Sequence, residues 1–234
     1  MAHPPSMVVE NVAAIRDRIE VAAKRAGRRA SEVILVGISK SVPAERIREA
    51  FEAGVQHFGA NRVQEWESKA PHLESIGATW HFVGHLQRNK ATKAVQLFHT
   101  IDSVDSLPLA EKLDHAVGEG RRLPVLIEVR LDPAAAKSGC DPAVLPRLAE
   151  GVLLLPHLEL RGLMSVPAPA SDSREARPFF SHLRELRDQL ASHLDWPLRE
   201  LSMGMSHDFD VAIEEGATQI RVGTALFSNR IPAK

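Results

Sequence analysis

Short apolar segments alternate with helical patterns along the chain, and this alternation restricts the folds that the chain can adopt. The apolar segments are predicted to be strands at residues 33–39, 55–59, 79–83, 99–103, 124–130, 158–164, 199–203 and 218–222. They read as runs of buried-type residues, which is typical of parallel strands covered on both faces. Eight such strands separated by helical patterns predict an α/β fold of the (β/α)8, or TIM barrel, type.

A further helix is predicted ahead of the first strand, over residues 9–26, where apolar residues recur at helical spacing and Gly27 suits the C-terminal end. The first turn, "GISKSV", is not a G-x-G-x-x-G nucleotide motif, so an open dinucleotide-binding sheet has little support. The nearest candidate for a linker, "SVPAPASDS" at 165–173, fits a long loop after the sixth strand. Residues 1–234 are therefore expected to form one TIM-barrel domain with an extra N-terminal helix.

Composition argues against several classes of function. The 234 residues include 29 Lys and Arg against 30 Asp and Glu, so no basic surplus points to nucleic acid. The single cysteine, Cys140, rules out an internal disulfide framework and fits a reducing cytosol. The opening "MAHPPSMVVE" does not read as a secretory signal, and the most apolar run, "GVLLLPHLEL", is too short to span a bilayer. We expect a cytoplasmic protein without a nucleic-acid or membrane partner.

Polar residues follow several of the predicted strands, at the barrel end where active sites of this fold lie. Lys40 ends the run "VILVGIS" and is either a solvated strand terminus or an amine directed into a site. The loops after strands seven and eight, "LSMGMSHD" and "IRVGTALFS", occupy the frequent phosphate-binding corner. Ser206 is expected at the start of the "DFDVAI" helix and Thr224 at the start of the last one. There they either help to bind an anion or act as ordinary N-caps.

Arg221 lies within the predicted strand "QIRVG", between two apolar neighbours. Strand alternation directs its side chain to the face opposite Ile220 and Val222. If that face is the barrel interior, the guanidinium needs a partner there; otherwise it points outward and pairs with a helix carboxylate.

Together these motifs resemble those of the pyridoxal 5′-phosphate (PLP) homeostasis proteins, a family similar in fold to the barrel domain of alanine racemase. The matching stretches are "LVGISKSVP", "HFGANRVQE", "WHFVGHLQRNK", "GLMSVP", "LSMGMSHDFDVAIEEGATQIRVGTALF" and, more weakly, "AAAKSGC". They follow the order of the family between residues 35 and 227. "WHFVGHLQRNK" and "LSMGMSHD" together are highly specific.

The resemblance implies a role for each matching residue. Lys40 corresponds to the lysine that forms a Schiff base with PLP, and Arg221 to the arginine that faces the pyridine nitrogen. The residues that correspond to phosphate-holding segments are Ser202, Ser206, Gly223 and Thr224. Those that correspond to positions lining the cofactor pocket are Asn61, Gly84 and Met164. Ala60, Arg62 and Ser228 depart from the usual pattern of the family, as does the end of strand five, "EVRLDPAAAKSG", and we expect these departures at the rim of the site.

An arginine at the pyridine nitrogen keeps that nitrogen unprotonated, because a guanidinium can only donate hydrogen bonds. A neutral pyridine is a weaker electron sink, which favours holding the cofactor over turning substrates over. The chain has no tyrosine, so it lacks the second acid–base group that alanine racemase uses. His81, His85 and His207 are the candidates to replace it, and each also has an ordinary packing or surface interpretation.

Two other groups of residues have side chains that could carry out chemistry. His81 and His85 are four residues apart on an extended segment, but no third metal ligand is apparent, so no metal site is expected. Cys140 precedes a helical pattern, where a thiol can be activated, yet a lone incidental cysteine is the simpler interpretation.

The leading hypothesis is a PLP-binding carrier or regulator of PLP homeostasis, monomeric, with PLP-dependent apo-enzymes as recipients. The alternatives are a PLP-dependent amino-acid racemase of low activity and a Schiff-base aldolase that uses Lys40. A third is a phosphate-binding interaction protein without covalent chemistry.

Overall fold

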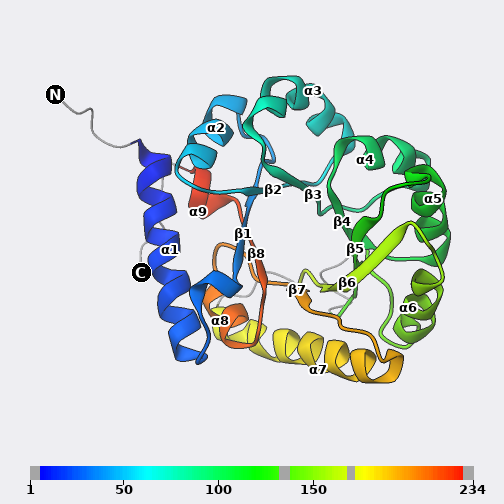
Figure 1. The fold of residues 1–234 in the computed structure, drawn as a ribbon. Coiled ribbons are helices and arrows are strands. Elements are labelled where there is room, and N and C mark those ends of the chain that lie inside the picture. The colour runs from blue at the N-terminus through cyan, green and yellow to red at the C-terminus, as the bar shows by residue number, and fades with distance from the viewer. Residues whose placement is uncertain (1–5, 132–137, 168–171, 229–234) are drawn as a thin grey trace.

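The computed structural model describes residues 6–131, 138–167 and 172–228, and in this part of the chain parallel strands close into a barrel (Figure 1). The strands are β1 (Ile34–Ile38), β2 (His57–Ala60), β3 (Thr79–Phe82), β4 (Thr100–Val104), β5 (Leu123–Glu128), β6 (Leu158–Met164), β7 (Glu200–Ser202) and β8 (Gln219–Val222). β8 pairs back onto β1, with Arg221 opposite Val36. The predicted (β/α)8 barrel is confirmed, and every predicted strand begins and ends within two residues of an observed one.

Helices surround the barrel on the outside (Figure 1). They are α1 (Met7–Arg25), α2 (Ala44–Glu52), α3 (Val63–Leu73), α4 (Ala91–Leu97), α5 (Leu107–Val117), α6 (Leu145–Leu153), α7 (Arg177–Leu194), α8 (Phe209–Glu214) and α9 (Thr224–Phe227). Short 3-10 turns occupy Ala30–Glu32, Glu74–Ile76, Arg88–Lys90 and Ser173–Ala176. No helix of the described residues is long and apolar enough to cross a membrane.

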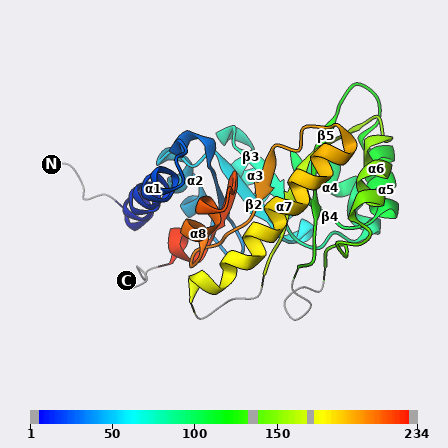
Figure 2. The same ribbon diagram turned by 90° about the horizontal axis from the view of Figure 1, so that it is seen from below.

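The predicted N-terminal helix is α1, and it packs beside α8 and α9 (Figures 1 and 2). Its buried face carries residues at helical spacing, among them Val12, Ile15 and Ile19. Arg18 on its flank forms an ion pair with Asp210 of α8. This first helix therefore covers the seam where the last strand meets the first.

Alternating side chains along the strands separate an outer aromatic layer from the barrel interior. Phe58 on β2 stacks on Trp80 of β3 at a centroid distance of 5.3 Å, and Trp80 lies 3.8 Å from Trp66 of α3. These rings fill the space between the strands and the helices. The residues in between, such as His57 and His81, point into the barrel.

The barrel interior contains a chain of hydrogen bonds between three neighbouring strands. His57 Nδ1 lies 3.0 Å from His81 Nε2, and His81 Nδ1 lies 2.9 Å from Asp102 Oδ2. Thr100 donates to Asp102 Oδ1 over 2.7 Å. Because His81 and Asp102 are almost wholly buried, these bonds meet the need of buried polar groups for partners.

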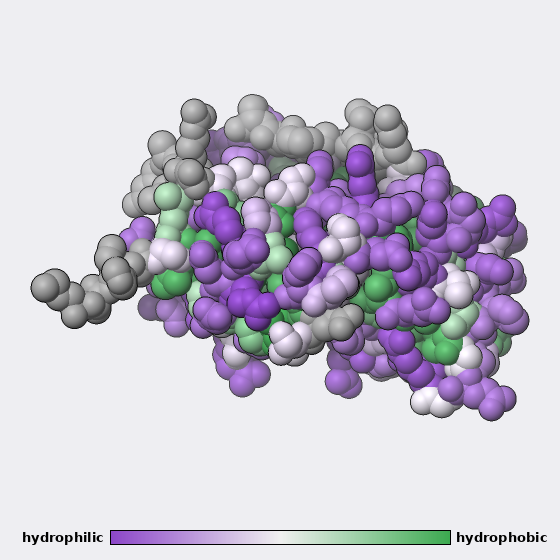
Figure 3. Space-filling model, turned by 90° about the horizontal axis from the view of Figure 1, so that it is seen from above, coloured by the Kyte–Doolittle hydropathy of each residue, from purple (hydrophilic) through white to green (hydrophobic). Residues whose placement is uncertain are grey.

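The side of the molecule drawn in Figure 3 is mainly hydrophilic, with small, separate apolar areas. The large apolar side chains that are exposed are scattered along the sequence, from Met7 and Val21 to Val144 and Leu154.

Candidate functional site

Lys40 lies just beyond the carboxyl end of β1, in a turn that is anchored on both sides. The Ser39 hydroxyl donates to the Gly59 carbonyl over 3.0 Å, and the Ser41 N–H donates to Glu65 Oε1 over 2.7 Å. Ser41 has a φ of 57°, in the left-handed region, which turns the chain sharply after Lys40. The Lys40 side chain is exposed and its amine has no partner among the described residues.

A second lysine at this strand end is held firmly. Lys69 of α3 donates to the Ser39 carbonyl over 2.9 Å and forms an ion pair with Glu65 at 2.8 Å. Of these two neighbouring amines, Lys40 is the one whose nitrogen is available for chemistry.

Asn61 and Gly84 meet at the carboxyl ends of β2 and β3. A Cβ on Gly84 would lie 2.3 Å from the Asn61 carbonyl oxygen, so only glycine allows the two loops to approach so closely. The Gly84 carbonyl accepts a hydrogen bond from Ser103 over 2.6 Å. Asn61 Oδ1 is buried and has no hydrogen-bond partner among the residues that the structure describes, so it could accept a hydrogen bond from a ligand.

Arg221 points into the barrel, where it is 4% exposed. Its Nη1 donates to the Ser202 hydroxyl and its Nη2 to the Ser165 carbonyl, each over 2.8 Å. Burial lowers the pKa of Arg221, opposed by the carboxylates of Asp102, Glu128 and Asp208. The open question of its direction is thus answered: it faces inward, and the partners that it contacts are neutral oxygens.

Met164 and Ser202 lie opposite each other at the ends of β6 and β7, and both side chains are wholly buried. They form the inner wall beside the Arg221 guanidinium. Met164, which is expected to line the pocket, and Ser202, which is expected near the phosphate, are therefore neighbours of Arg221, which is expected to face the pyridine nitrogen.

The loops after β7 and β8 are joined by a hydrogen bond from the Ala225 N–H to the Ser206 hydroxyl, 3.2 Å long. One detail of the prediction is wrong: Ser206 does not begin the helix. Asp208 precedes α8, and its side chain accepts from the Met205 N–H over 2.6 Å. Ser206 lies three residues before α8, and its hydroxyl accepts from Ala225 instead of from the first turn of this helix.

Gly223 and Thr224 lie where β8 leads into α9. A Cβ on Gly223 would lie 3.3 Å from Ile38 Cβ, so the glycine brings this loop close to the end of β1. Thr224 is exposed at the start of α9, as predicted. The end of β1 and the loop after β8 are thus adjacent at one corner of the barrel mouth.

Two buried acidic residues were missed by the reasoning from sequence. Asp102 on β4 ends the internal hydrogen-bond chain, and Glu128 is the last residue of β5. Each carboxylate stands inside an apolar strand, in "TIDSV" and "VLIEV". That placement could have identified them from the sequence, because a charged residue is rarely buried in a core strand unless a specific interaction compensates for its burial.

The three histidines considered for acid–base work do not gather around Lys40. His81 is engaged with Asp102 and His57, His85 lies 3.3 Å from Asp105 and is largely exposed, and His207 is exposed. No group of three or more His, Cys, Asp or Glu side chains in the described ranges could hold a metal ion. Burial raises the pKa of the Cys140 thiol to about 12, so this cysteine is not an activated nucleophile.

The departures from the usual family pattern fall in different environments. Arg62 is exposed, whereas Ala60 is 5% exposed at the end of β2, next to Asn61. Ser228 follows α9. Residues 134–137 of "AAAKSGC" and 168–171 of "SVPAPASDS" lie outside the described residues.

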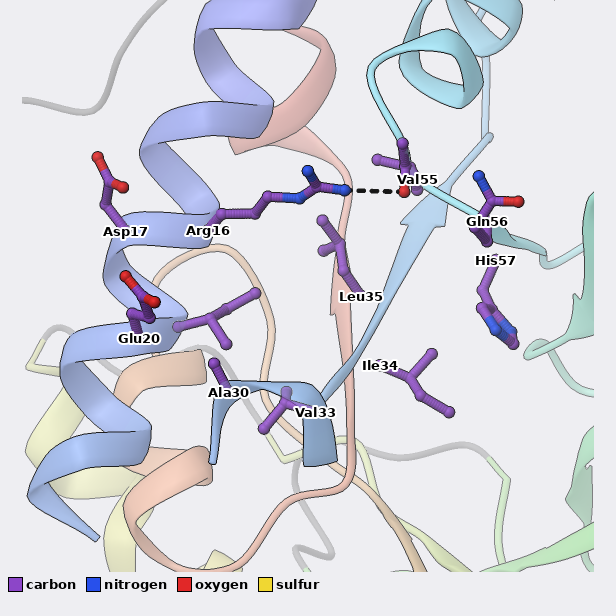
Figure 4. Close-up of a pocket in the computed structure, with 12 residues that line it drawn as sticks. Arg16, Asp17, Glu20, Ala30, Val33, Ile34, Leu35, Val55, Gln56 and His57 are labelled. Carbon is purple, nitrogen blue, oxygen red and sulfur yellow. Dashed lines mark hydrogen bonds between the residues drawn. The ribbon is translucent and has the colours of Figure 1, made fainter. Parts of the chain in front are cut away.

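A separate cavity of about 560 Å³ lies at the opposite end of β1, between α1 and the starts of β1 and β2 (Figure 4). Arg16 of α1 crosses its edge and donates to the Gly54 carbonyl over 2.9 Å. None of the residues that the sequence singled out lines this cavity. It lies at the amino-terminal end of the strands, whereas sites in this fold lie at the carboxyl end.

Three features indicate the class of proteins to which the chain belongs: the closed barrel, the exposed lysine after β1 and the inward-facing arginine on β8. Residues 11–230 match the model of the family described as alanine racemase, N-terminal domain. Alanine racemase from Clostridium difficile shares this fold, with a TM-score of 0.72 at 14% identity; the match covers 96% of this chain and 58% of that one.

Closer relatives narrow the class. The chain is 43% identical over 226 residues to the pyridoxal phosphate homeostasis protein of Pseudomonas aeruginosa, covering 96% of both chains. It is 39% identical to that of Escherichia coli K12, covering 95% of this chain and 97% of the relative. PipY of Synechococcus elongatus, a structure solved with PLP bound, is 40% identical with a TM-score of 0.84, covering 95% of this chain and all of PipY. The chain belongs to the pyridoxal phosphate homeostasis protein family.

Proposed function

We propose that the chain is one PLP-binding domain that holds PLP as a Schiff base on Lys40 and acts as a carrier or regulator in PLP homeostasis. The observation that carries this proposal is the free amine of Lys40, set in an anchored turn beside the loop after β8. Family membership supports it, as does PipY, whose structure was solved with PLP bound.

The residues around Lys40 fit the chemical groups of PLP. The aldehyde of PLP condenses with a lysine amine, and Lys40 is available for that reaction. Ser206, Gly223 and Thr224 surround the corner where the phosphate would bind, with Ser202 in the wall beneath. Within the described ranges, Asn61 Oδ1 is a buried acceptor without a partner, which fits a residue that contacts a ligand. Gly84 and Met164 complete the lining.

Arg221 would face the pyridine nitrogen as a hydrogen-bond donor. A guanidinium has no proton that it readily gives up and no acceptor atom, so the ring nitrogen stays neutral. A neutral ring stabilises a carbanion poorly, so the arrangement favours storage and delivery of PLP over turnover of amino acids.

Reduction with borohydride tests the proposal directly. PLP added to the protein should give an imine absorbance band, and reduction followed by peptide mapping should place PLP on Lys40. Lys40→Ala should abolish the band. Lys69→Met is the matched control, because Lys69 lies at the same strand end but is tied to Ser39 and Glu65. An adduct that maps mainly to any other lysine would refute the assignment.

The same proposal extends to the cellular setting. A monomer in the cytoplasm would deliver PLP to PLP-dependent apo-enzymes; the lone, buried thiol of Cys140 and the scattered exposed apolar side chains support this. Sedimentation of the purified protein tests the oligomeric state. Reactivation of an apo-enzyme by the PLP-loaded protein, compared with the same concentration of free PLP, tests delivery.

A further inference from the structure

Glu128 is a buried carboxylate at the carboxyl end of β5. It is 4% exposed and pairs in register with Met164 of β6, which places it at the level of the candidate site. In the closed order of eight strands, β5 is four strands away from β1 in either direction. Glu128 therefore stands across the barrel mouth from Lys40.

The two oxygens of Glu128 are not equally satisfied. Oε1 accepts a hydrogen bond of 2.9 Å from the Ser138 hydroxyl, whereas Oε2 is buried and has no hydrogen-bond partner among the described residues. A buried carboxylate normally meets cations or several N–H groups, and an oxygen without a partner costs free energy. A hydrogen bond from a ligand would remove that cost.

Among the described residues, the charged groups near Glu128 do not supply the missing donor. Arg221 of β8 influences the Glu128 carboxyl group electrostatically but donates to Ser202 and Ser165. Asp105 after β4 and His85 after β3 also influence it, and they lie 3.3 Å from each other. The nearby Cys140 thiol is also buried, and Met164 of β6 carries no charge.

Burial raises the pKa of Glu128, and Asp105 adds to that effect, whereas Ser138, Arg221 and His85 oppose it. Burial therefore favours the neutral form of this carboxyl group more than water does. In its neutral form the group can donate a hydrogen bond as well as accept one.

We propose that Glu128 is a further ligand-contacting residue of the PLP site, which binds the cofactor as the neutral acid, through its free oxygen, from the side opposite Lys40. This inference rests on the proposed function. The proton stays on the carboxyl group and is shared in a hydrogen bond, so no bond of the cofactor is made or broken. When Glu128 ionises, it loses its donor and places a negative charge beside PLP, and the affinity for PLP falls.

Three variants test the inference by PLP titration followed by absorbance between about pH 6 and pH 9. Glu128→Gln keeps the shape of the side chain and a hydrogen-bond donor but cannot ionise. At the acidic end of the range it should bind PLP within about threefold of wild type. At high pH it should lack the loss of PLP affinity that ionisation of Glu128 causes in the wild type. Glu128→Leu should weaken PLP about tenfold or more at all pH values. Glu200→Gln is the matched control. Glu200 is a half-buried carboxylate whose pKa is also raised by burial, but it lies at the amino end of β7, where Gln219 donates to it. This variant should keep the wild-type pH profile.

The outcomes separate this inference from the proposed function. If wild type binds PLP but Glu128→Gln shows the same pH profile, or Glu128→Leu binds as tightly, the role of Glu128 is overturned while Lys40 is not. If wild type does not bind PLP, both are overturned. Thermal melting checks the fold of Glu128→Leu, and the comparison of wild type with Glu128→Gln stands even if the leucine variant does not fold.

Discussion

Arg221 and Ser202, on the neighbouring strands β8 and β7, share a hydrogen bond of 2.8 Å in the barrel interior. The serine hydroxyl is wholly buried, so this bond holds the guanidinium in one position beneath the mouth. Ser202 and the Ser165 carbonyl are neutral acceptors, so Arg221 forms no direct ion pair within the described part of the chain. Under the proposed function its charge would be available to a ligand.

The phosphate corner gives the first prediction. Thr224→Ala should weaken binding of PLP by roughly 1.5–3 kcal/mol, the usual value of a hydrogen bond to a charged group, and should leave pyridoxal unaffected. Because Thr224 is exposed, protein stability should stay unchanged. Titrations with both ligands provide the measurement, and equal losses for the two would show that Thr224 does not touch the phosphate.

Ser206→Ala should have two effects, since its hydroxyl also accepts the Ala225 N–H. PLP should again weaken more than pyridoxal, and the free energy of unfolding should fall by about 0.5–1.5 kcal/mol as the two loops separate. Chemical denaturation of the empty protein measures the second effect. A variant as stable as wild type would mean that this bond between the loops contributes little.

Gly84→Ala tests the close approach of the β2 and β3 loops. The new Cβ would lie 2.3 Å from the Asn61 carbonyl oxygen, so the backbone must shift, and we expect a loss of about 1–3 kcal/mol in stability together with weaker PLP binding. Gly151→Ala in α6 is the control, because its Cβ meets mainly the flexible end of Leu107. Unfolding curves of both variants give the comparison; a Gly84→Ala protein with wild-type stability and affinity would contradict the prediction.

His57 should make stability depend on pH. Burial, and then the neighbouring His81, lower the pKa of His57 to about 4 from 6.5, with Asp102 opposing. The folded chain therefore binds fewer protons than the unfolded chain between these values. His57 therefore lowers the free energy of unfolding as the pH falls from about 6.5 toward 4, and it has no such effect above about pH 6.5. Denaturation curves of His57→Gln should show a shallower decline over this range, whereas the exposed His182→Gln should follow wild type.

Amino acids should not be turned over at enzyme-like rates. Under the proposed function, Arg221 would disfavour charge build-up on the cofactor ring, and Glu128 would be committed to the cofactor. The chain also has no tyrosine. The assay incubates the PLP-loaded protein with L- or D-alanine and follows chirality, deuterium exchange at Cα and keto-acid formation. A racemisation rate within about 1–10³ s⁻¹, the ordinary range for enzymes, would overturn the carrier hypothesis.

The amino-acid sequence by itself determined the barrel, the added helix and the position of Lys40. These follow from local information: strand-length apolar runs, helical spacing, and a lysine directly after a buried strand. Strand alternation showed that the Arg221 side chain lies on the face opposite Ile220 and Val222. It did not decide whether that face is the barrel interior or the outside, because alternation alone does not say which face of a strand is buried in the barrel.

Only the tertiary structure decided which polar groups meet. His81 was considered with His85, four residues away, but it bonds to His57 and Asp102, which are 24 and 21 residues away. Asp208 takes the cap position that Ser206 was expected to hold, and Ser206 instead accepts from Ala225, 19 residues further on. Glu128 became a candidate for ligand contact only because the structure buries it and leaves its Oε2 without a hydrogen-bond partner among the described residues. Hydrogen-bond partners in a barrel are set by the closure and register of the strands, and these depend on the packing of the whole chain rather than on neighbours in sequence.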